Sequence, residues 1–255
     1  MNPEAAARIL FDSSAKGVHY PDALRGQLDL ESAYRTQQAV LALHLGNGEE
    51  QAGWKIGFTA PAVRAQFRSA EPVFGYLLGS RGYGSGLSFS VAEIANPAIE
   101  PELCFILGKP LKGPGVTPTQ VADAVASVAP AFEIIELRGD MAADLGLGIA
   151  DDVSQWAWVT GPEVRPYPRA LDLGALRATM TRNGEVVADA LGRDVIDNQL
   201  ESIAWLANRL ATFGSSLKVG QRVLTGSFSR PMPIGRGERW EATFAGIGSV
   251  AARFD

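Results

Sequence analysis

The feature that most constrains the fold is a pair of apolar stretches, residues 99–107 and 131–137, on either side of a short helix signal. Apolar runs of this length, bounded by turn residues, are typical of buried strands. Between them, Thr117-Pro118-Thr119-Gln120 supplies an N-cap, a proline at the first helical position and a glutamine at N3. The pattern therefore predicts strand, helix and strand in succession, with Pro130 ending the helix.

The remaining elements extend this core into an α+β chain. Asn183-Gly184 predicts a hairpin turn between two short strands, residues 177–182 and 185–189. Residues 82–86 are expected to form a glycine-rich turn. The order of elements predicts an α+β fold with a large mixed sheet. Helices are expected at residues 3–14, 29–46 and 197–213, and further strands at residues 154–160, 222–224, 240–244 and 249–254.

Composition and charge are those of an ordinary globular chain. With 46% hydrophobic and 20% charged residues, the sequence can bury one large core, so we expect a helical segment over residues 1–50 and one main domain over 51–255. The net charge of −5 argues against nucleic-acid or anionic-membrane partners, which need clustered Lys and Arg. Cys104 is the single cysteine, which excludes an intrachain disulfide and favours a reducing compartment. Neither a membrane span of roughly 20 apolar residues nor a signal peptide is recognisable, so we expect a cytoplasmic protein.

Three glutamates form the strongest candidate site. Glu100 and Glu102 alternate with apolar residues on a predicted strand, so their side chains point the same way, roughly 7 Å apart. Glu133 lies in the next apolar stretch, which one helical crossover can bring beside the first pair. Carboxylates that share one spot repel unless a cation or proton lies between them. Three carboxylates without His or Cys select a hard ion, Mg²⁺ or Mn²⁺, whereas a solvated strand face is the alternative that the residues alone leave open.

Other chemistries have less support. His19 and His44 are the only histidines, which argues against an imidazole-rich zinc site and against a Ser-His-Asp triad. No G-x-S-x-G motif is present. Cys104 shares the predicted face of Glu100 and Glu102, where a small buried filler is the simplest role for it.

Several motifs resemble one enzyme family over almost the whole chain. They are Gly53-Trp54-Lys55-Ile56-Gly57-Phe58-Thr59, Glu71-Pro72-Val73-Phe74-Gly75, Ile99-Glu100-Pro101-Glu102, Pro130-Ala131-Phe132-Glu133, Arg138, and Ala150-Asp151-Asp152-Val153-Ser154. The sequence is similar to the hydratase/decarboxylase family of aromatic meta-cleavage pathways. That family includes 2-keto-4-pentenoate hydratase, 2-oxohept-3-ene-1,7-dioate hydratase and 4-oxalocrotonate decarboxylase, and it belongs to the fumarylacetoacetate hydrolase fold. The resemblance implies a mixed β-sheet roll with an N-terminal helical segment, in which residues 51–255 form the metal-binding catalytic domain.

The resemblance also implies roles for individual residues. It assigns Mg²⁺ or Mn²⁺ to Glu100, Glu102 and Glu133, with a small 2-oxo acid chelating the ion, which acts as a Lewis acid. Lys55 would lie near the substrate carboxylate or shuttle a proton. Asp151 and Ser154 would be further catalytic residues that orient water, with strand capping as the alternative. Substrate binding is assigned to three residues: Arg138, Arg230 and Ser227.

Departures from the family pattern leave the reaction open. Val73 occupies a position where hydratases usually carry aspartate and decarboxylases an aliphatic residue, whereas Arg230 could pair with the distal carboxylate of a dicarboxylic substrate. Asp152 stands where the family usually has asparagine, and a histidine of the family is absent from residues 191–203. We therefore expect a hydratase acting on a 2-hydroxy-2,4-dienoate or 2-oxo-alkenoate. The alternatives are a decarboxylase of a 2-oxo dicarboxylate, a C–C hydrolase of an acylpyruvate, and a non-catalytic subunit. The resemblance further implies a homo-oligomer that can associate with a partner enzyme of the same pathway.

Overall fold

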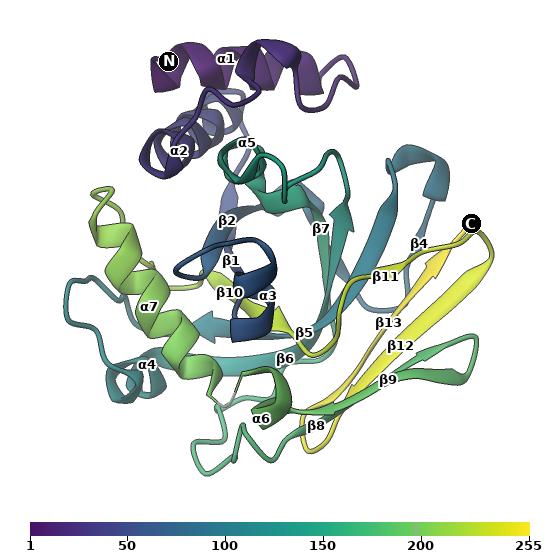
Figure 1. Ribbon diagram of the computed structural model, residues 1–255. Coiled ribbons are helices and arrows are strands. Elements are labelled where there is room, and N and C mark those ends of the chain that lie inside the picture. Colours follow the sequence, from purple (N-terminus) through teal and green to yellow (C-terminus); the bar gives the residue numbers. More distant parts are fainter. Residues whose placement is uncertain (197) are drawn as a thin grey trace.

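The computed structural model describes residues 1–196 and 198–255 of the chain. Two helices stand together at the top of a strongly curved sheet, and a second, smaller sheet packs against another side of it, at the lower right (Figure 1). The predicted start of a helix at Asp197 lies outside the described residues. No helix among the residues that are described is long and apolar enough to cross a membrane.

The two N-terminal helices form as their sequences predict. Helix α1 (Pro3–Ser14) begins at Asn2, whose side chain accepts hydrogen bonds from the first turn. Helix α2 (Leu30–Gly46) begins at Asp29, whose Oδ1 accepts from Ser32 N at 2.8 Å. The two helices pack against each other, and α2 also contacts α5 (Leu145–Ala150). The division of the chain into a helical segment, residues 1–50, and a main domain, residues 51–255, stays a prediction.

The large sheet supplies the walls of the molecule. It is mixed: β1 (Gln51–Gly57) pairs parallel with β10 (Arg222–Ser227), and β3 (Gly82–Gly84) pairs parallel with β7 (Gln155–Thr160). The other pairs between its described strands are antiparallel. The sheet curls until Trp158 Nε1 donates to Leu78 O at 3.2 Å, which connects the strand at one end of the row with the last strand but one at the other. The order is β2 (Val73–Leu78), β1 (Gln51–Gly57), β10 (Arg222–Ser227), β5 (Pro97–Leu107), β6 (Val125–Glu136), β7 (Gln155–Thr160) and β3 (Gly82–Gly84), with β11 (Met232–Pro233) beside β5.

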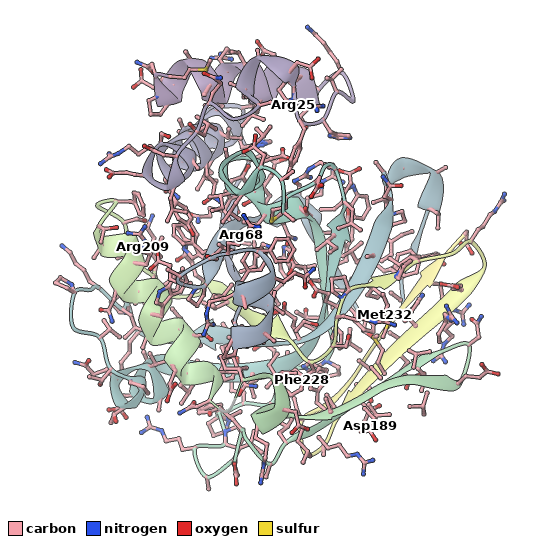
Figure 2. The ribbon with its side chains drawn as sticks, viewed as in Figure 1. Arg25, Arg68, Asp189, Arg209, Phe228 and Met232 are labelled. Atoms are coloured by element: carbon pink, nitrogen blue, oxygen red, sulfur yellow. The ribbon has the colours of Figure 1, made fainter. Side chains whose placement is uncertain are left out.

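The second sheet covers one outer side of this roll. Its order is β4 (Ser88–Phe89), β13 (Gly248–Phe254), β12 (Glu238–Phe244), β8 (Arg177–Arg182) and β9 (Glu185–Leu191). Asn183 and Gly184 both have positive φ, 53° and 86°, so the predicted β8–β9 hairpin turn is confirmed. Phe228 packs edge-on against Phe244 at 5.3 Å and joins the two sheets (Figure 2).

The other described helices are short, except for α7, which lies on the side of the large sheet away from the second sheet, at the left of Figure 1. Helix α7 (Gln199–Ala211) buries one face that includes Ile203, Leu206 and Leu210, as its periodicity predicts. The remaining helical elements are α3 (Pro61–Gln66), α4 (Pro118–Ala124) and α6 (Gly192–Val195), together with the 3₁₀ turns Asp22–Leu24, Gly79–Arg81, Val91–Glu93 and Asp152–Ser154.

One expectation about local structure is wrong, and a second holds only in part. Pro130 does not end a helix, because α4 stops at Ala124 and β6 runs straight through the proline. Pro130 O accepts from Gly161 N at 2.8 Å, just past the end of β7, so the missing N–H of the proline breaks no bond within that pair of strands. The turn expected over residues 82–86 is limited to Ser85 and Gly86, because residues 82–84 form strand β3. Gly82 leaves room there for the Trp158 ring, which a Cβ would meet at 2.1 Å. The α+β prediction with a large mixed sheet is confirmed.

Candidate active site

Strand β5 separates two environments, as its alternating sequence predicts. Leu103 and Phe105 face outward into the main core, whereas Cys104 and Ile106 face into the roll. The inward residues form a small apolar floor. Its members are Leu77, Cys104, Ile106, Ala131, Trp158 and Leu224. Burial raises the pKa of the Cys104 thiol to about 12, so it is a neutral filler of this floor.

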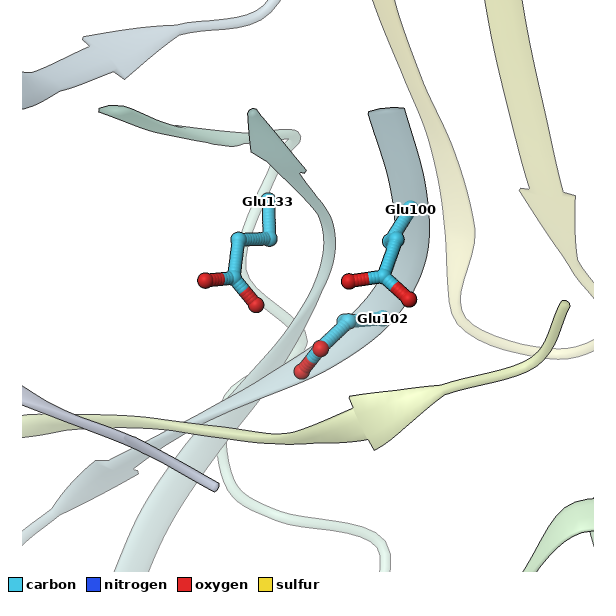
Figure 3. Close-up of side chains that lie close together, drawn as sticks. All are labelled: Glu100, Glu102 and Glu133. Carbon is cyan, nitrogen blue, oxygen red and sulfur yellow. The ribbon is translucent and has the colours of Figure 1, made fainter. Parts of the chain in front are cut away.

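The three predicted glutamates meet inside the roll next to this floor. Glu100 is the register partner of Glu133 across β5 and β6, and Glu102 points the same way two residues later. One carboxylate oxygen from each lies within 4.8 Å of the others. Figure 3 shows the three carboxylates turned toward a common space. Glu102 and Glu133 are almost fully buried, with 1% and 2% of their surface exposed.

A bulge in β10 fixes one of these carboxylates. The register between β10 and β5 shifts between Leu224 and Ser227, and the intervening Gly226 has φ of 108°. This conformation directs Gly226 N to Glu102 Oε2 at 2.8 Å. A Cβ on Gly226 would come within 2.3 Å of Thr59 Oγ1, so glycine is required by space as well as by conformation.

Lys55 is the cation of the site. Only 3% of its side chain is exposed, and Nζ lies 2.9 Å from Glu133 Oε1. The same Nζ donates to Val153 O at 2.8 Å. Burial alone would lower the pKa of Lys55, but the carboxylates of Glu133, Asp152 and Glu100 together more than offset it, so the pKa is raised and the ammonium stays charged.

The cluster fits a hard divalent cation. Burial and the nearby Glu133 raise the pKa of Glu100 to about 8, and burial with two neighbouring carboxylates raises that of Glu102 well above its usual range. Among the described residues, the buried Glu133 Oε1 has the Lys55 ammonium as its ion-pair partner and no further hydrogen-bond donor. One ammonium cannot balance three carboxylates, and an all-oxygen donor set is what Mg²⁺ and Mn²⁺ prefer.

These shifts predict how the metal-free protein responds to pH. Because the folded pKa of Glu100 is about 8 against an ordinary 4.5, the folded state favours its protonated form. The contribution of Glu100 to the free energy of unfolding is therefore fully present below pH 4.5 and is lost as the pH rises toward 8. In EDTA, we expect the Tm to fall on the order of 5 °C between pH 5 and pH 8, and saturating Mg²⁺ to suppress the fall. Calorimetry measures the Tm of wild type and of Glu100→Gln at each pH. If the Tm of Glu100→Gln fell as steeply with pH as that of wild type, the fall could not be due to Glu100.

The segment after α5 divides the predicted residues into two groups. Arg138 Nε lies 2.6 Å from Asp151 Oδ2, and Arg138 also donates to Gln155 O. These side chains line a cavity of 460 Å³ between the N-terminal helices and the outer side of the sheet, together with His19 and His44. Arg138 and Asp151 are thus brought to each other rather than to the glutamates, and their predicted roles stay predictions.

Among the other predicted residues, strand register places Ser227 beside the cluster. Ser227 is the register partner of Glu102, and its hydroxyl helps to stabilise the charged form of Glu100. Arg230 follows three residues later and is exposed. Val73 is fully buried on β2, where it is the register partner of Gly57. Ser154 is buried at the end of the 3₁₀ turn before β7.

Three contributors to the site were not predicted. Asp152 Oδ1 accepts from Tyr76 N at 2.7 Å beside Lys55, Gly75 leaves room for both side chains, and Gly226 N binds Glu102. The signal was present in part, because Asp152 already stood out as a departure from the family pattern. Nothing local in the sequence indicates that β2 and the turn before β7 meet.

Comparison with known proteins places this geometry in a family. Residues 55–255 match the family described as fumarylacetoacetate (FAA) hydrolase, C-terminal. The chain is 35% identical over 231 residues to 2-hydroxyhexa-2,4-dienoate hydratase of Comamonas testosteroni, covering 89% of this chain and 87% of the relative. It is 34% identical over 246 residues to 2-oxo-hept-4-ene-1,7-dioate hydratase of Escherichia coli, covering 94% and 90%.

A solved structure agrees in fold and in length. The structure of 4-oxalocrotonate decarboxylase from Pseudomonas putida G7, complexed with magnesium and adipate, superposes with a TM-score of 0.92 at 28% identity. The match covers 99% of this chain and 97% of that one. The predicted roll with an N-terminal helical segment is therefore confirmed. The chain is a member of the fumarylacetoacetate hydrolase family, in the branch that contains these hydratases and this decarboxylase.

Proposed function

We propose that this protein is a metal-dependent lyase that adds water to a 2-hydroxy-2,4-dienoate or 2-oxo-alkenoate. The observation that carries the proposal is the cluster of Glu100, Glu102 and Glu133 within 4.8 Å, with the ammonium of Lys55 against it. Relatives named as hydratases, at 35% and 34% identity over most of the chain, support this reaction class.

The three glutamates would hold Mg²⁺ or Mn²⁺. A solved relative is complexed with magnesium and adipate, a small dicarboxylate. When bound, the ion would supply Lewis-acid polarisation of the 2-oxo group. Gly226 N keeps the Glu102 carboxylate oriented, and the pairing of β5 with β6 sets the spacing of Glu100 and Glu133.

Lys55 would act on the substrate itself. Its ammonium is buried and is held by Glu133 and Val153 O, so it can bind the substrate carboxylate or donate a proton from Nζ without reorganising. The apolar floor of Leu77, Leu224 and their neighbours excludes bulk water from beneath the cluster. The site thus favours stabilising the negative charge that develops when a proton next to a 2-oxo group is lost.

Decarboxylation of a 2-oxo dicarboxylate is the second candidate. Val73 favours it, because this buried aliphatic side chain lies on the face of β2 that carries Gly75, the register partner of Lys55. A carboxylate at Val73 would supply an acid/base group for water addition, and valine cannot. A C–C hydrolase has less support, since both histidines line the outer cavity rather than the glutamate cluster.

Parallel assays separate the two candidates. The purified protein with Mg²⁺ or Mn²⁺ is given a 2-hydroxy-2,4-dienoate and, separately, 4-oxalocrotonate. We expect loss of the dienol absorbance with a 4-hydroxy-2-oxo acid as product, and no turnover in EDTA. Carbon dioxide release from 4-oxalocrotonate without hydration would select the second candidate, and metal-independent turnover would contradict both.

The position of Arg230 favours a substrate that carries a second, distal carboxylate. It is exposed three residues beyond Ser227, where its guanidinium can pair with a distal carboxylate. We expect Arg230→Ala to lower kcat/KM for a 1,7-dioate by about 30-fold and for a monocarboxylic dienoate less than threefold. Steady-state kinetics on both substrates measures the ratio. An equal loss on both would show that Arg230 does not read the distal carboxylate.

A further inference from the structure

The turn that precedes β7 has an unusual backbone. Asp152, Val153 and Ser154 have φ of 57°, 50° and 63°, all in the left-handed region, and none is glycine. This conformation is unfavourable for each of these residues, and most for a β-branched side chain such as that of Val153. Such a turn persists only where surrounding contacts hold it in place.

Two hydrogen bonds tie the turn to neighbouring strands. Strand β2 lies at one end of the large sheet, and its Tyr76 N donates to Asp152 Oδ1 at 2.7 Å. On the adjacent strand β1, Lys55 Nζ donates to Val153 O at 2.8 Å. The side chain of Asp152 therefore anchors the turn, and the next carbonyl receives the ammonium of Lys55.

Gly75 leaves the space in which this arrangement fits. A Cβ there would lie 2.7 Å from Asp152 Oδ1, 3.0 Å from Lys55 Cε and 3.1 Å from Asp152 O. The carboxylate of Asp152 and the side-chain stem of Lys55 thus both occupy the space that a Cβ at Gly75 would need. Gly75 is also the register partner of Lys55, so β2 presents its one residue without a side chain where the two meet.

We propose that Asp152 is a positioning residue for Lys55, anchoring the turn whose Val153 carbonyl holds the ammonium against Glu133. The proposal rests on the proposed function only in giving Lys55 a role in the reaction. The charged or titratable groups that face Asp152 are Lys55, Arg138, Asp151 and Tyr76. Burial raises the pKa of Asp152 well above its usual range, so the anchor depends on Oδ1 as an acceptor rather than on full charge.

A double-mutant cycle tests the proposal. We expect Asp152→Ala to lower kcat by about 30-fold, with KM and Mn²⁺ affinity changed less than threefold, because Lys55 loses its position while the glutamates keep theirs. Asp152→Asn retains an acceptor of the same shape and should stay within about threefold of wild type. In a Lys55→Met background, Asp152→Ala should have no further effect on kcat.

Two further variants guard against misfolding. Gly75→Ala should reproduce the loss in kcat by driving the two side chains apart, and it leaves Asp152 itself intact. Asp189→Asn is the matched control, since this carboxylate is exposed at the edge of the second sheet, paired with Arg177 (Figure 2). Independent effects of Lys55→Met and Asp152→Ala, or full activity of Asp152→Ala, would overturn the proposal.

The readouts keep this proposal separate from the lyase assignment. Deuterium exchange at C3 of pyruvate requires an enolate but neither lyase reaction. Because the Lys55 ammonium would bind the pyruvate carboxylate, the exchange rate reports on Lys55 even if neither lyase substrate turns over. A crystal structure of Asp152→Ala adds a measurement that needs no activity. Displacement of Lys55 Nζ from Val153 O supports the proposal, and an unchanged Lys55 contradicts it.

Discussion

Replacing Glu102 by glutamine should abolish metal-dependent turnover, with a loss of at least about 1000-fold in kcat/KM. Glutamine keeps an oxygen that can accept from Gly226 N, which lies 2.8 Å from Glu102 Oε2, but it removes one of the anionic ligands. Because burial already raises the pKa of Glu102, the metal-free protein should lose no stability. We expect its Tm in EDTA to equal or exceed that of wild type, and the stabilisation by Mg²⁺ to disappear.

Thermal unfolding with and without Mg²⁺, beside steady-state kinetics, measures both effects. Glu185→Gln is the matched control, since Glu185 is exposed at the start of β9. It should change neither quantity. A Glu102→Gln protein that keeps its Mg²⁺-dependent rise in Tm would show that the cluster is not the metal site.

Replacing Lys55 by methionine should separate catalysis from metal binding. Methionine keeps the length of the stem but removes the ammonium that lies 2.9 Å from Glu133 Oε1. We expect kcat to fall by about 100-fold or more, because the group that binds the substrate carboxylate or moves the proton is gone. Mn²⁺ should bind about tenfold more tightly at pH 8, because a positive charge no longer competes for Glu133.

Isothermal titration with Mn²⁺ tests whether the metal binds more tightly, and single-turnover kinetics test whether the reaction is slower. Lys112→Met, at an exposed lysine, should leave both unchanged. Weaker Mn²⁺ binding in Lys55→Met would mean that the ammonium organises the carboxylates rather than opposing the cation. Unchanged turnover would remove Lys55 from the reaction.

The glutamate pair could be predicted because it depends only on strand periodicity. Two residues apart on a strand, Glu100 and Glu102 must share a face, and the structure places them there with Cys104. The partnership with Glu133 depends on register between strands far apart in sequence. Apolar pattern allowed it, the family resemblance supported it, and the structure shows Glu100 directly opposite Glu133.

What could not be predicted depends on contacts between distant segments. Pro130 is tolerated inside β6 because the residue opposite it, Gly161, lies just beyond the end of β7. No local feature of the sequence reveals where β7 ends relative to Pro130. The left-handed turn at Asp152 and Val153 contradicts local preference, and β2 and Lys55 hold it in place. The family resemblance predicts a role for Asp151, which stays a prediction, and nothing in the sequence indicates that its neighbour Asp152 faces Lys55.

The central claim is that Glu100, Glu102 and Glu133 together hold one divalent cation. Anomalous diffraction at the manganese absorption edge, from a crystal soaked in Mn²⁺, tests it most directly. We expect a single strong peak between the three carboxylates, displaced by excess Mg²⁺ and absent from Glu133→Gln. A peak elsewhere in the chain, or no peak at a Mn²⁺ concentration that supports turnover, would contradict the claim.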